Sequence, residues 1–412
     1  MDPFLHLETI SRPCITLAWI HDYFQDRIES PSATRMEKKS VIIVGGGIIG
    51  MSIGWELLRS GHQVTIVERD RVGRGASWLA GGMLAANAEV GFEEMEFYRV
   101  SAESLRRWPA YARMLEKESS KGVYYREEGS ISVADDRDSA EALRRKFDFQ
   151  TEHGLDVRWL SGAEALELEP FLAPGLSAAV HSPLDHQVDN RRVLDALKHL
   201  ILEHGGRIEE DSPVVAIVPD AEAPAIQMDG RESISGDVVV LAAGAWSRQL
   251  NGVEPESLPA VRPVKGQTLD LQVEAPFDLR HVVRGPHASV IPKDETRVAV
   301  GATEEEMGFD VHVTAGGVYK LLKGAWEIVP GIYDLTFVGS HAGLRPGSRD
   351  NDPIVGWSDA PGVYYASGHY RNGVLLTPIT AQEAALEIAE NNESDWLRGF
   401  RPQRFQLTDP IG

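Results

Sequence analysis

The sequence predicts a mixed α/β fold with two domains. One is built around a parallel sheet assembled from separated segments of the chain, and the other, with a mixed or antiparallel sheet, is inserted between those segments. Three observations predict this fold. A strand, a glycine-rich turn, a helix and a second strand follow one another over residues 41–68, a continuous apolar run covers 237–244, and a strand, a tight turn and a helix cover 362–390. Buried parallel strands read as continuous apolar runs, so we expect the three segments to share one sheet.

The first segment is a βαβ unit of about 30 residues. Residues 41–44 form an apolar run typical of a buried strand, 48–60 have the periodicity of a helix that ends before Gly61, and 62–67 predict a second strand. This succession is typical of a Rossmann-like nucleotide-binding domain.

The turn inside this unit carries three glycines at the spacing G-x-G-x-x-G. Gly45 permits the tight turn, Gly47 lets backbone amides approach a pyrophosphate, and Gly50 allows close packing of helix on strand. Glu68 ends the second strand, where a carboxylate can bind the hydroxyls of an adenosine ribose. Together these features predict a bound dinucleotide. The alternative is a glycine-rich contact between helix and strand with no ligand.

The rest of the chain mixes helices with short strands. Residues 93–119 and 190–204 predict helices, and a strand at 362–367 is followed by a helix from about 373 to 390. Strand candidates between them lie at 124–135, 268–274, 289–293 and 296–302.

These elements divide the chain into two domains and two ends. The nucleotide-binding domain is expected to comprise 40–92, 185–258 and 338–395, and the substrate-binding domain 93–184 and 259–337. Residues 1–39 are expected to be an extension outside the fold, with Met36 as an alternative start, and 396–412 a C-terminal tail.

Composition argues against several classes of function. The 41 Lys and Arg against 62 Asp and Glu give a net charge of −21, which repels phosphate backbones and anionic lipid, so neither nucleic acid nor membrane is an expected partner. No apolar run approaches the roughly 20 residues that cross a bilayer. The single cysteine, Cys14, gives no disulfide framework and suits a reducing cytoplasm. The histidines lack the spacing of metal ligands, so no metal is predicted.

Motifs that occur in order over residues 40–395 resemble those of the glycine oxidases of thiamine biosynthesis, which belong to the D-amino-acid oxidase-like superfamily of flavoenzymes. They are ASWLAGGMLA (76–85), DHQVDNRR (185–192), GATEEEMGFD (301–310), GLRPGSRDNDPIVG (343–356) and GHYRNGVLLTPITA (368–381). Residues 71–90 are similar to the superfamily segment that passes the FAD pyrophosphate and flavin ring, and LAAGAWS (241–247) is similar to its second FAD-contact strand.

The resemblance implies non-covalent FAD and a small amino-acid substrate. Glycine, and also sarcosine or small D-amino acids, would be oxidised to the imine by hydride transfer from Cα to flavin N5, with O₂ reduced to H₂O₂. The imine would hydrolyse to the oxo acid or feed thiazole assembly. Relatives form homotetramers, whereas the sequence itself shows no interface pattern.

The cofactor-binding residues expected from the glycine turn and the resemblance come from several segments. The four residues of the second turn precede a helix whose N-terminus would stabilise negative charge on the reduced flavin. The set is Gly45, Gly47, Ile48, Ile49, Gly50, Glu68, Arg69, Ser77, Gly81, Gly82, Met83, Val215, Ala243, Gly244, Arg371, Asn372, Gly373 and Val374.

In the resembling family the arginine of GLRPG pairs with the substrate carboxylate, and Arg345 occupies that position. A guanidinium fixes a carboxylate through two parallel hydrogen bonds, although an arginine between Gly and Pro is often only a turn residue. Arg284 stands in a segment where some glycine oxidases carry an active-site tyrosine, so it is a second anion contact, a gate residue or a solvated edge charge. Tyr370 is expected in the substrate wall or packed beneath the turn, and His369 packed beneath it.

Several other functions share this scaffold. Sarcosine-oxidase-type enzymes often tether FAD to a cysteine near the substrate, whereas Cys14 lies in the N-terminal extension. D-amino-acid dehydrogenases pass electrons to a membrane quinone, and no segment here suggests membrane attachment. A tRNA-modifying oxidase needs a basic surface, which the net charge of −21 disfavours. A flavin-binding module without turnover would not need Arg345.

Overall fold

The structure is a computed structural model that describes residues 37–253 and 258–405. From Lys39 onward the described residues form one compact unit. The expected extension, with Cys14 and Met36, lies outside the described residues except at its last three positions. None of the helices in the described ranges combines the length and apolar character needed to cross a bilayer.

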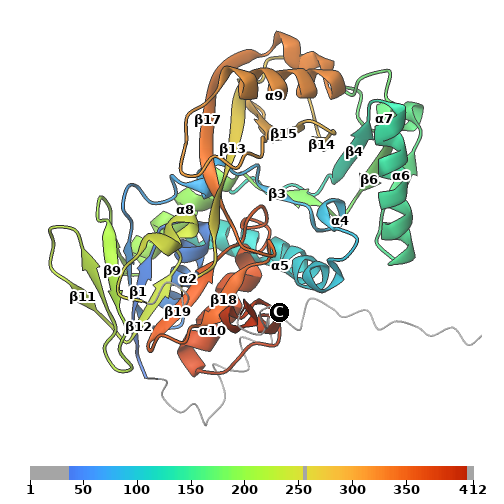
Figure 1. Cartoon of the computed structure of the whole chain (residues 1–412). Coiled ribbons are helices and arrows are strands. Elements are labelled where there is room, and N and C mark those ends of the chain that lie inside the picture. The colour runs from blue at the N-terminus through green and yellow to red at the C-terminus, as the bar shows by residue number, and fades with distance from the viewer. Residues whose placement is uncertain (1–36, 254–257, 406–412) are drawn as a thin grey trace, which may run out of the picture. The chain divides into compact units, whose positions relative to one another are not determined.

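A six-stranded sheet joins the three segments that the sequence assigns to one sheet (Figure 1). Strand β1 (Ser40–Val44) pairs in parallel with β12 (Val238–Leu241) on one side and with β2 (Gln63–Val67) on the other. Strand β12 also pairs in parallel with β19 (Val363–Ser367). The central strands are almost entirely buried, as a sheet covered on both faces requires, whereas the edge strand at residues 207–209 has no buried residue. Their order is β18 (Ile354–Trp357), β19 (Val363–Ser367), β12 (Val238–Leu241), β1 (Ser40–Val44), β2 (Gln63–Val67) and β8 (Arg207–Glu209).

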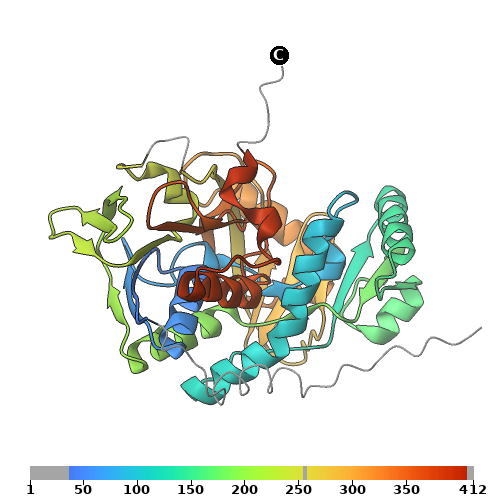
Figure 2. The same ribbon diagram turned by 90° about the horizontal axis from the view of Figure 1, so that it is seen from below.

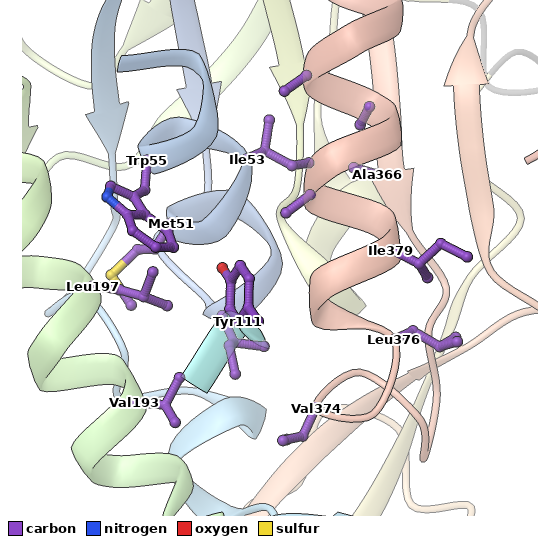
Figure 3. Close-up of a cluster of buried hydrophobic side chains, with 14 of the residues drawn as sticks. Met51, Ile53, Trp55, Tyr111, Val193, Leu197, Ala366, Val374, Leu376 and Ile379 are labelled. Atoms are coloured by element: carbon purple, nitrogen blue, oxygen red, sulfur yellow. The ribbon is translucent and has the colours of Figure 1, made fainter. Parts of the chain in front are cut away.

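Three helices pack on this sheet, α2 (Ile48–Arg59), α8 (Asn190–Glu203) and α10 (Thr377–Glu390), and α5 (Met95–Ser119) packs on α8 and α10. Figure 2 shows α10 lying beside α5, in red and cyan. Figure 3 shows Met51 and Trp55 of α2 near Leu197 of α8, and these fully buried side chains belong to the main core. Helix α2, which follows the glycine turn, is therefore held by apolar contacts with its neighbours.

Helix α10 begins at Thr377, four residues later than the sequence predicts. Residues 373–376 form a turn in which the Leu376 N–H donates to the Asn372 carbonyl over 2.8 Å. Pro378 stands at the start of the helix, where its missing N–H has no helical partner to lose. The turn after β19 is consequently longer than the periodicity of the sequence suggests.

A second sheet has eight strands and is mixed, as predicted. Only β14 and β4 pair in parallel, and the other neighbours are antiparallel. The order is β17 (Thr336–Gly347), β13 (Arg262–Gln272), β16 (Arg297–Gly301), β15 (Ser289–Asp294), β14 (Val282–Arg284), β4 (Ser130–Ala134), β6 (Ala178–Ser182) and β5 (Arg158–Leu160).

This sheet has its own apolar core, to which α9 (Ala315–Ile328) and α7 (Gly162–Leu168) contribute, and α6 (Arg137–Glu152) packs on β4 and β6. Strand β17 belongs entirely to this sheet, so the predicted domain boundary between residues 337 and 338 falls inside a strand. The reason is that β17 pairs with β13 along its whole length, and the local sequence of β17 does not reveal this distant partner.

The remaining elements are short. Leu397 and Phe400, in the segment predicted as a tail, are buried in the main core, and Arg401 pairs with Glu387 over 2.6 Å. Residues 396–405 therefore pack on the fold, and 406–412 lie outside the described residues. The short elements are α3 (Ala76–Leu79), α4 (Ala86–Glu89), the pair β3 (Met83–Leu84) and β7 (His186–Gln187), the sheet β9 (Val214–Val218), β10 (Ala225–Met228) and β11 (Ile234–Ser235), and the 3-10 helices Gly244–Gln249, Pro330–Asp334, Arg398–Phe400 and Pro402–Phe405.

Candidate active site

A cavity of about 850 Å³ is lined by residues of both large sheets. On one side it reaches Val44 and Val67, the last residues of β1 and β2, and on the other it reaches strands β13, β15, β16 and β17. A crevice at the carboxyl ends of parallel strands is where sheets of this kind bind their ligands. Its volume lies toward the upper end of ordinary ligand sites, which suits a long molecule.

The glycine turn forms one wall of this cavity. Gly45 has φ of +110°, and a Cβ there would stand 2.4 Å from the Ala242 carbonyl oxygen, so only glycine fits. At Gly47 a Cβ would meet only the Ser77 hydroxyl, at 3.3 Å, so the backbone is open toward the cavity. The Ile48 N–H, at the start of α2, points to the same Ser77 Oγ over 3.0 Å. The open backbone at Gly47 and the N-terminus of α2 beside it fit the pyrophosphate of a dinucleotide.

Glu68 is fixed at the same end of the cavity. Its carboxylate accepts hydrogen bonds from the backbone N–H groups of Gly46 (2.8 Å) and Asp70 (3.1 Å). The guanidinium of Arg69 stacks 3.6 Å from the centre of the Trp246 ring, and both residues line the cavity. A carboxylate at the end of β2, with flat side chains beside it, fits the adenosine of FAD.

Lys293 anchors the segment that the sequence places against the flavin. Its ammonium is buried and donates to the carbonyl of Gly81, to Asn190 Oδ1 (3.2 Å) and to the carbonyl of Val188 (3.4 Å). Burial lowers the pKa of Lys293 to about 7. Sequence reasoning missed this residue, because a lysine within a strand gives no sign of burial.

Arg345, near the end of β17, lines the cavity and is half-buried. Its Nη1 donates to the carbonyls of Thr303 (3.1 Å) and Lys265 (3.4 Å), and a Cβ at Gly266 would stand 2.5 Å from that nitrogen, so glycine makes room for the guanidinium. Within the described ranges no carboxylate approaches Arg345 to ion-pair distance. Burial lowers its pKa, so a bound anion would relieve a real electrostatic cost.

Arg284 also lines the cavity, but it is paired. Its Nη2 lies 2.9 Å from Glu89 Oε1, and its Nη1 lies 3.3 Å from the sulfur of Met83. With the Arg284 side chain only 16% exposed, the expectation of a solvated edge charge is wrong: the guanidinium faces an internal carboxylate. Glu89 was missed from the sequence, since a glutamate ending a four-residue helix carries no motif.

The turn after β19 completes this end of the cavity. Tyr370 lines it with a positive φ of +46°, and burial together with nearby Glu304 raises its pKa to about 12. His369 is buried, its Nε2 lies 3.1 Å from the Thr380 hydroxyl, and burial lowers its pKa to about 3. Through Thr380, His369 packs against α10, in agreement with the predicted position beneath the turn, and it also lines part of the cavity.

Most residues predicted for the cofactor line this one cavity, and the rest lie behind its wall. A Cβ at Gly50 would stand 2.2 Å from the Gly45 carbonyl oxygen, which makes it the packing glycine that the motif predicts. The lining residues are Gly45, Gly47, Ile48, Ile49, Glu68, Arg69, Ser77, Gly81, Met83, Val215, Ala243, Gly244, Arg371, Gly373 and Val374, whereas Gly50, Gly82 and Asn372 are not among them.

Further charged residues line the cavity without having been predicted. Arg191 and Arg297 both bind the Asp270 carboxylate, at 2.9 and 3.1 Å, and close one wall beside Lys293. Among the described residues no group of three or more acidic, histidine or cysteine side chains is arranged to hold a metal ion.

Comparison with known proteins gives consistent matches. Residues 40–386 match the model of the family described as FAD dependent oxidoreductase. The glycine oxidase of Geobacillus kaustophilus is 34% identical over 374 residues, covering 90% of this chain and 97% of that protein. The bifunctional protein ThiO/ThiG of Synechocystis is 32% identical and matches 89% of this chain but 54% of its own length. The crystal structure of the Geobacillus glycine oxidase superposes with a TM-score of 0.83, covering 91% of this chain and all of that one.

Proposed function

The chain belongs to the FAD-dependent oxidoreductase family, and from that premise we propose that it is a glycine oxidase: it oxidises glycine, and also sarcosine or small D-amino acids, to the imine and reduces O₂ to H₂O₂. The observation that carries the proposal is the half-buried guanidinium of Arg345, which faces the cavity and meets no carboxylate of the described residues.

Arg345 holds the carboxylate of the amino acid. A guanidinium offers two parallel N–H donors, so it fixes the direction as well as the place of the carboxylate. The main-chain carbonyls of Thr303 and Lys265 hold the guanidinium from behind, through Nη1. The α-carbon next to the carboxylate is thereby aimed at one point in the cavity, and placement of this kind lowers the barrier without a side-chain base.

The cofactor site uses residues from several parts of the chain. Gly47 and the N-terminus of α2 would hold the pyrophosphate, Glu68 would bind the adenosine ribose, and the turn at residues 371–374 would contact the flavin. Bound FAD supplies the acceptor for the hydride and passes the electrons to O₂. The walls formed by Met83 and Tyr370 keep water away from the substrate.

The product suits thiamine synthesis. Two similar proteins carry the names glycine oxidase and ThiO/ThiG, which supports the proposal that the imine supplies the thiazole. We place the reaction in the cytoplasm, where a chain with one cysteine needs no disulfide, and propose a homo-oligomer, which size measurement in solution would test.

Oxygen uptake and peroxide formation test the proposal. The purified yellow protein is mixed in air with glycine, sarcosine, D-alanine and a bulky D-amino acid, and both signals are followed. We expect peroxide with glycine and little or none with the bulky substrate. Flavin bleaching without oxygen uptake would show a dehydrogenase instead, and a flavin that no amine reduces would show a binding module.

A further inference from the structure

Three arginines and two glutamates meet at the substrate end of the cavity. Arg284, Arg345 and Arg371 line it together with Glu89 and Glu304. Glu89 lies 2.9 Å from Arg284 and 3.7 Å from Arg371, and Arg371 lies 3.6 Å from Glu304. Among these five side chains there are two carboxylates and three guanidiniums, so one positive charge has no partner within the set. That charge belongs to Arg345, which forms none of these ion pairs.

The pair of Glu89 and Arg284 is the closest of these contacts and the most enclosed. Their side chains are 15% and 16% exposed, whereas Arg371 and Glu304 are 46% and 56% exposed. Burial alone would raise the pKa of Glu89, but the charges of Arg284 and Arg371 outweigh it and keep the pKa below its usual value. Glu89 is therefore a charged, buried counter-ion for Arg284.

The backbone around Glu89 is held firmly. The Asp185 carboxylate accepts hydrogen bonds from the N–H groups of Asn87 and Ala88, both over 2.9 Å, and Gln150 donates to the Asn87 carbonyl over 2.7 Å. Arg284 is the last residue of β14 and is fixed by the sheet. Neither partner can leave the other without exposing a buried charge, so an incoming anion would have to displace a carboxylate already in place.

We propose that Glu89 is a specificity-determining residue: it occupies Arg284 from within the protein, so that only Arg345 is left for the substrate, and amines with a second carboxylate are disfavoured. The inference rests on the proposed function for its substrate class. It does not depend on turnover, because it concerns which anions the cavity binds.

Anion binding tests the proposal. The FAD-loaded enzyme is titrated with acetate, malonate and succinate, and dissociation constants are measured by calorimetry and by the change in flavin absorbance. In the wild type we expect neither dicarboxylate to bind more tightly than acetate. In Glu89→Gln, Arg284 is freed, and at least one dicarboxylate should bind about tenfold tighter than in the wild type while acetate changes by less than about threefold.

Three further variants show whether the gain arises at Arg284. The double variant Glu89→Gln/Arg284→Gln should lose it. Glu304→Gln, the matched control, removes a carboxylate that contacts Arg371 but not Arg284, and should show none. Glu89→Asp withdraws the carboxylate while keeping its charge, and should show a smaller gain of the same sign even if Glu89→Gln does not fold.

Some results would overturn the proposal. They are a wild type that already prefers a dicarboxylate, a gain that survives in the double variant, an equal gain in Glu304→Gln, or no gain in Glu89→Asp. Glycine oxidation by the wild type is measured separately. If the wild type does not oxidise glycine but the anions bind as expected, the proposed function fails and the role of Glu89 stands.

Discussion

Replacing Arg345 by alanine tests the substrate anchor. In its contacts with the described residues, the Arg345 guanidinium donates only through Nη1, to the main-chain carbonyls of Lys265 and Thr303. Its Nε and Nη2 therefore remain for a substrate carboxylate. Alanine removes both donors and the charge. Because Arg345 belongs to β17 and not to the glycine turn that we propose for the pyrophosphate, the variant should keep its yellow colour.

The size of the effect can be worked out from the bonds that are lost. Hydrogen bonds to charged groups contribute about 1.5–3 kcal/mol each, and two such bonds formed to a substrate carboxylate correspond to about 3–4 kcal/mol once desolvation of the carboxylate is allowed for. Each 1.4 kcal/mol is about tenfold, so kcat/KM for glycine should fall by a factor on the order of 10² to 10³. Most of the loss should appear in KM, because the carboxylate is bound in both ground and transition states.

Oxygen uptake at varied glycine concentration measures this effect. Arg345→Lys keeps the charge but not the fork and should fall between wild type and alanine. Arg349→Ala, at an exposed arginine that does not line the cavity, is the matched control and should change little. Flavin content and melting temperature are recorded for each variant. Glycine kinetics for Arg345→Ala within threefold of the wild type, with FAD retained, would refute the reasoning.

Three other substitutions test the cofactor site and two shifted charges. Glu68→Ala should lose FAD on dialysis while the FAD-loaded fraction keeps its KM, and full flavin content would show that the ribose contact is misassigned. Burial and the neighbouring Asp350 raise the pKa of Asp352 to about 6. The protonated carboxyl favours the folded state, so the protein loses this contribution to its stability as pH rises from about 4 to 6. Asp352→Asn should therefore be more stable than wild type at pH 7.5 by about 1 kcal/mol but not at pH 4. Burial lowers the pKa of Lys293 to about 7, so between pH 7 and 10 the folded state holds a neutral amine while the unfolded state holds a charged one. Wild type should therefore gain stability relative to Lys293→Met as pH rises from about 7 toward 10. A constant difference in unfolding free energy between the two proteins across that range would contradict this prediction.

Features set by local sequence were predictable. The run from β1 to Glu68 has its strand, turn, helix and acid close together, and each is recognised by the residues next to it. The start of α10 was predicted too early because Val374, Leu375 and Leu376 continue the apolar pattern, although they lie in a turn. Their burial in the main core, rather than helical geometry, accounts for the pattern.

Features that depend on distant partners were not predictable. Arg284 was left between three roles, because the residue that decides among them, Glu89, lies far away in the sequence and in a different kind of element. Lys293 is likewise explained only by the carbonyls of Gly81 and Val188, which come from two other segments. A sequence shows which side chains carry charge, whereas the fold decides which charges meet.

The pairing of β13 with β17 limits how this protein can change in evolution. Val264 lies opposite Arg345, and successive residues of a strand point to opposite faces. An insertion or deletion of one residue near that point would turn the guanidinium away from the cavity and leave a folded enzyme that binds its substrate weakly. The segment between the two strands contains β14, β15, β16 and α9, and the paired strands among them are bound by the same parity, so only the loops that join these elements are free of it. The irregularity at Asp270–Leu271 shows that an odd residue can be absorbed far from the anchor. Length variation among natural variants should accordingly gather in the loops that join the elements of residues 273–335 and avoid 262–268 and 341–347.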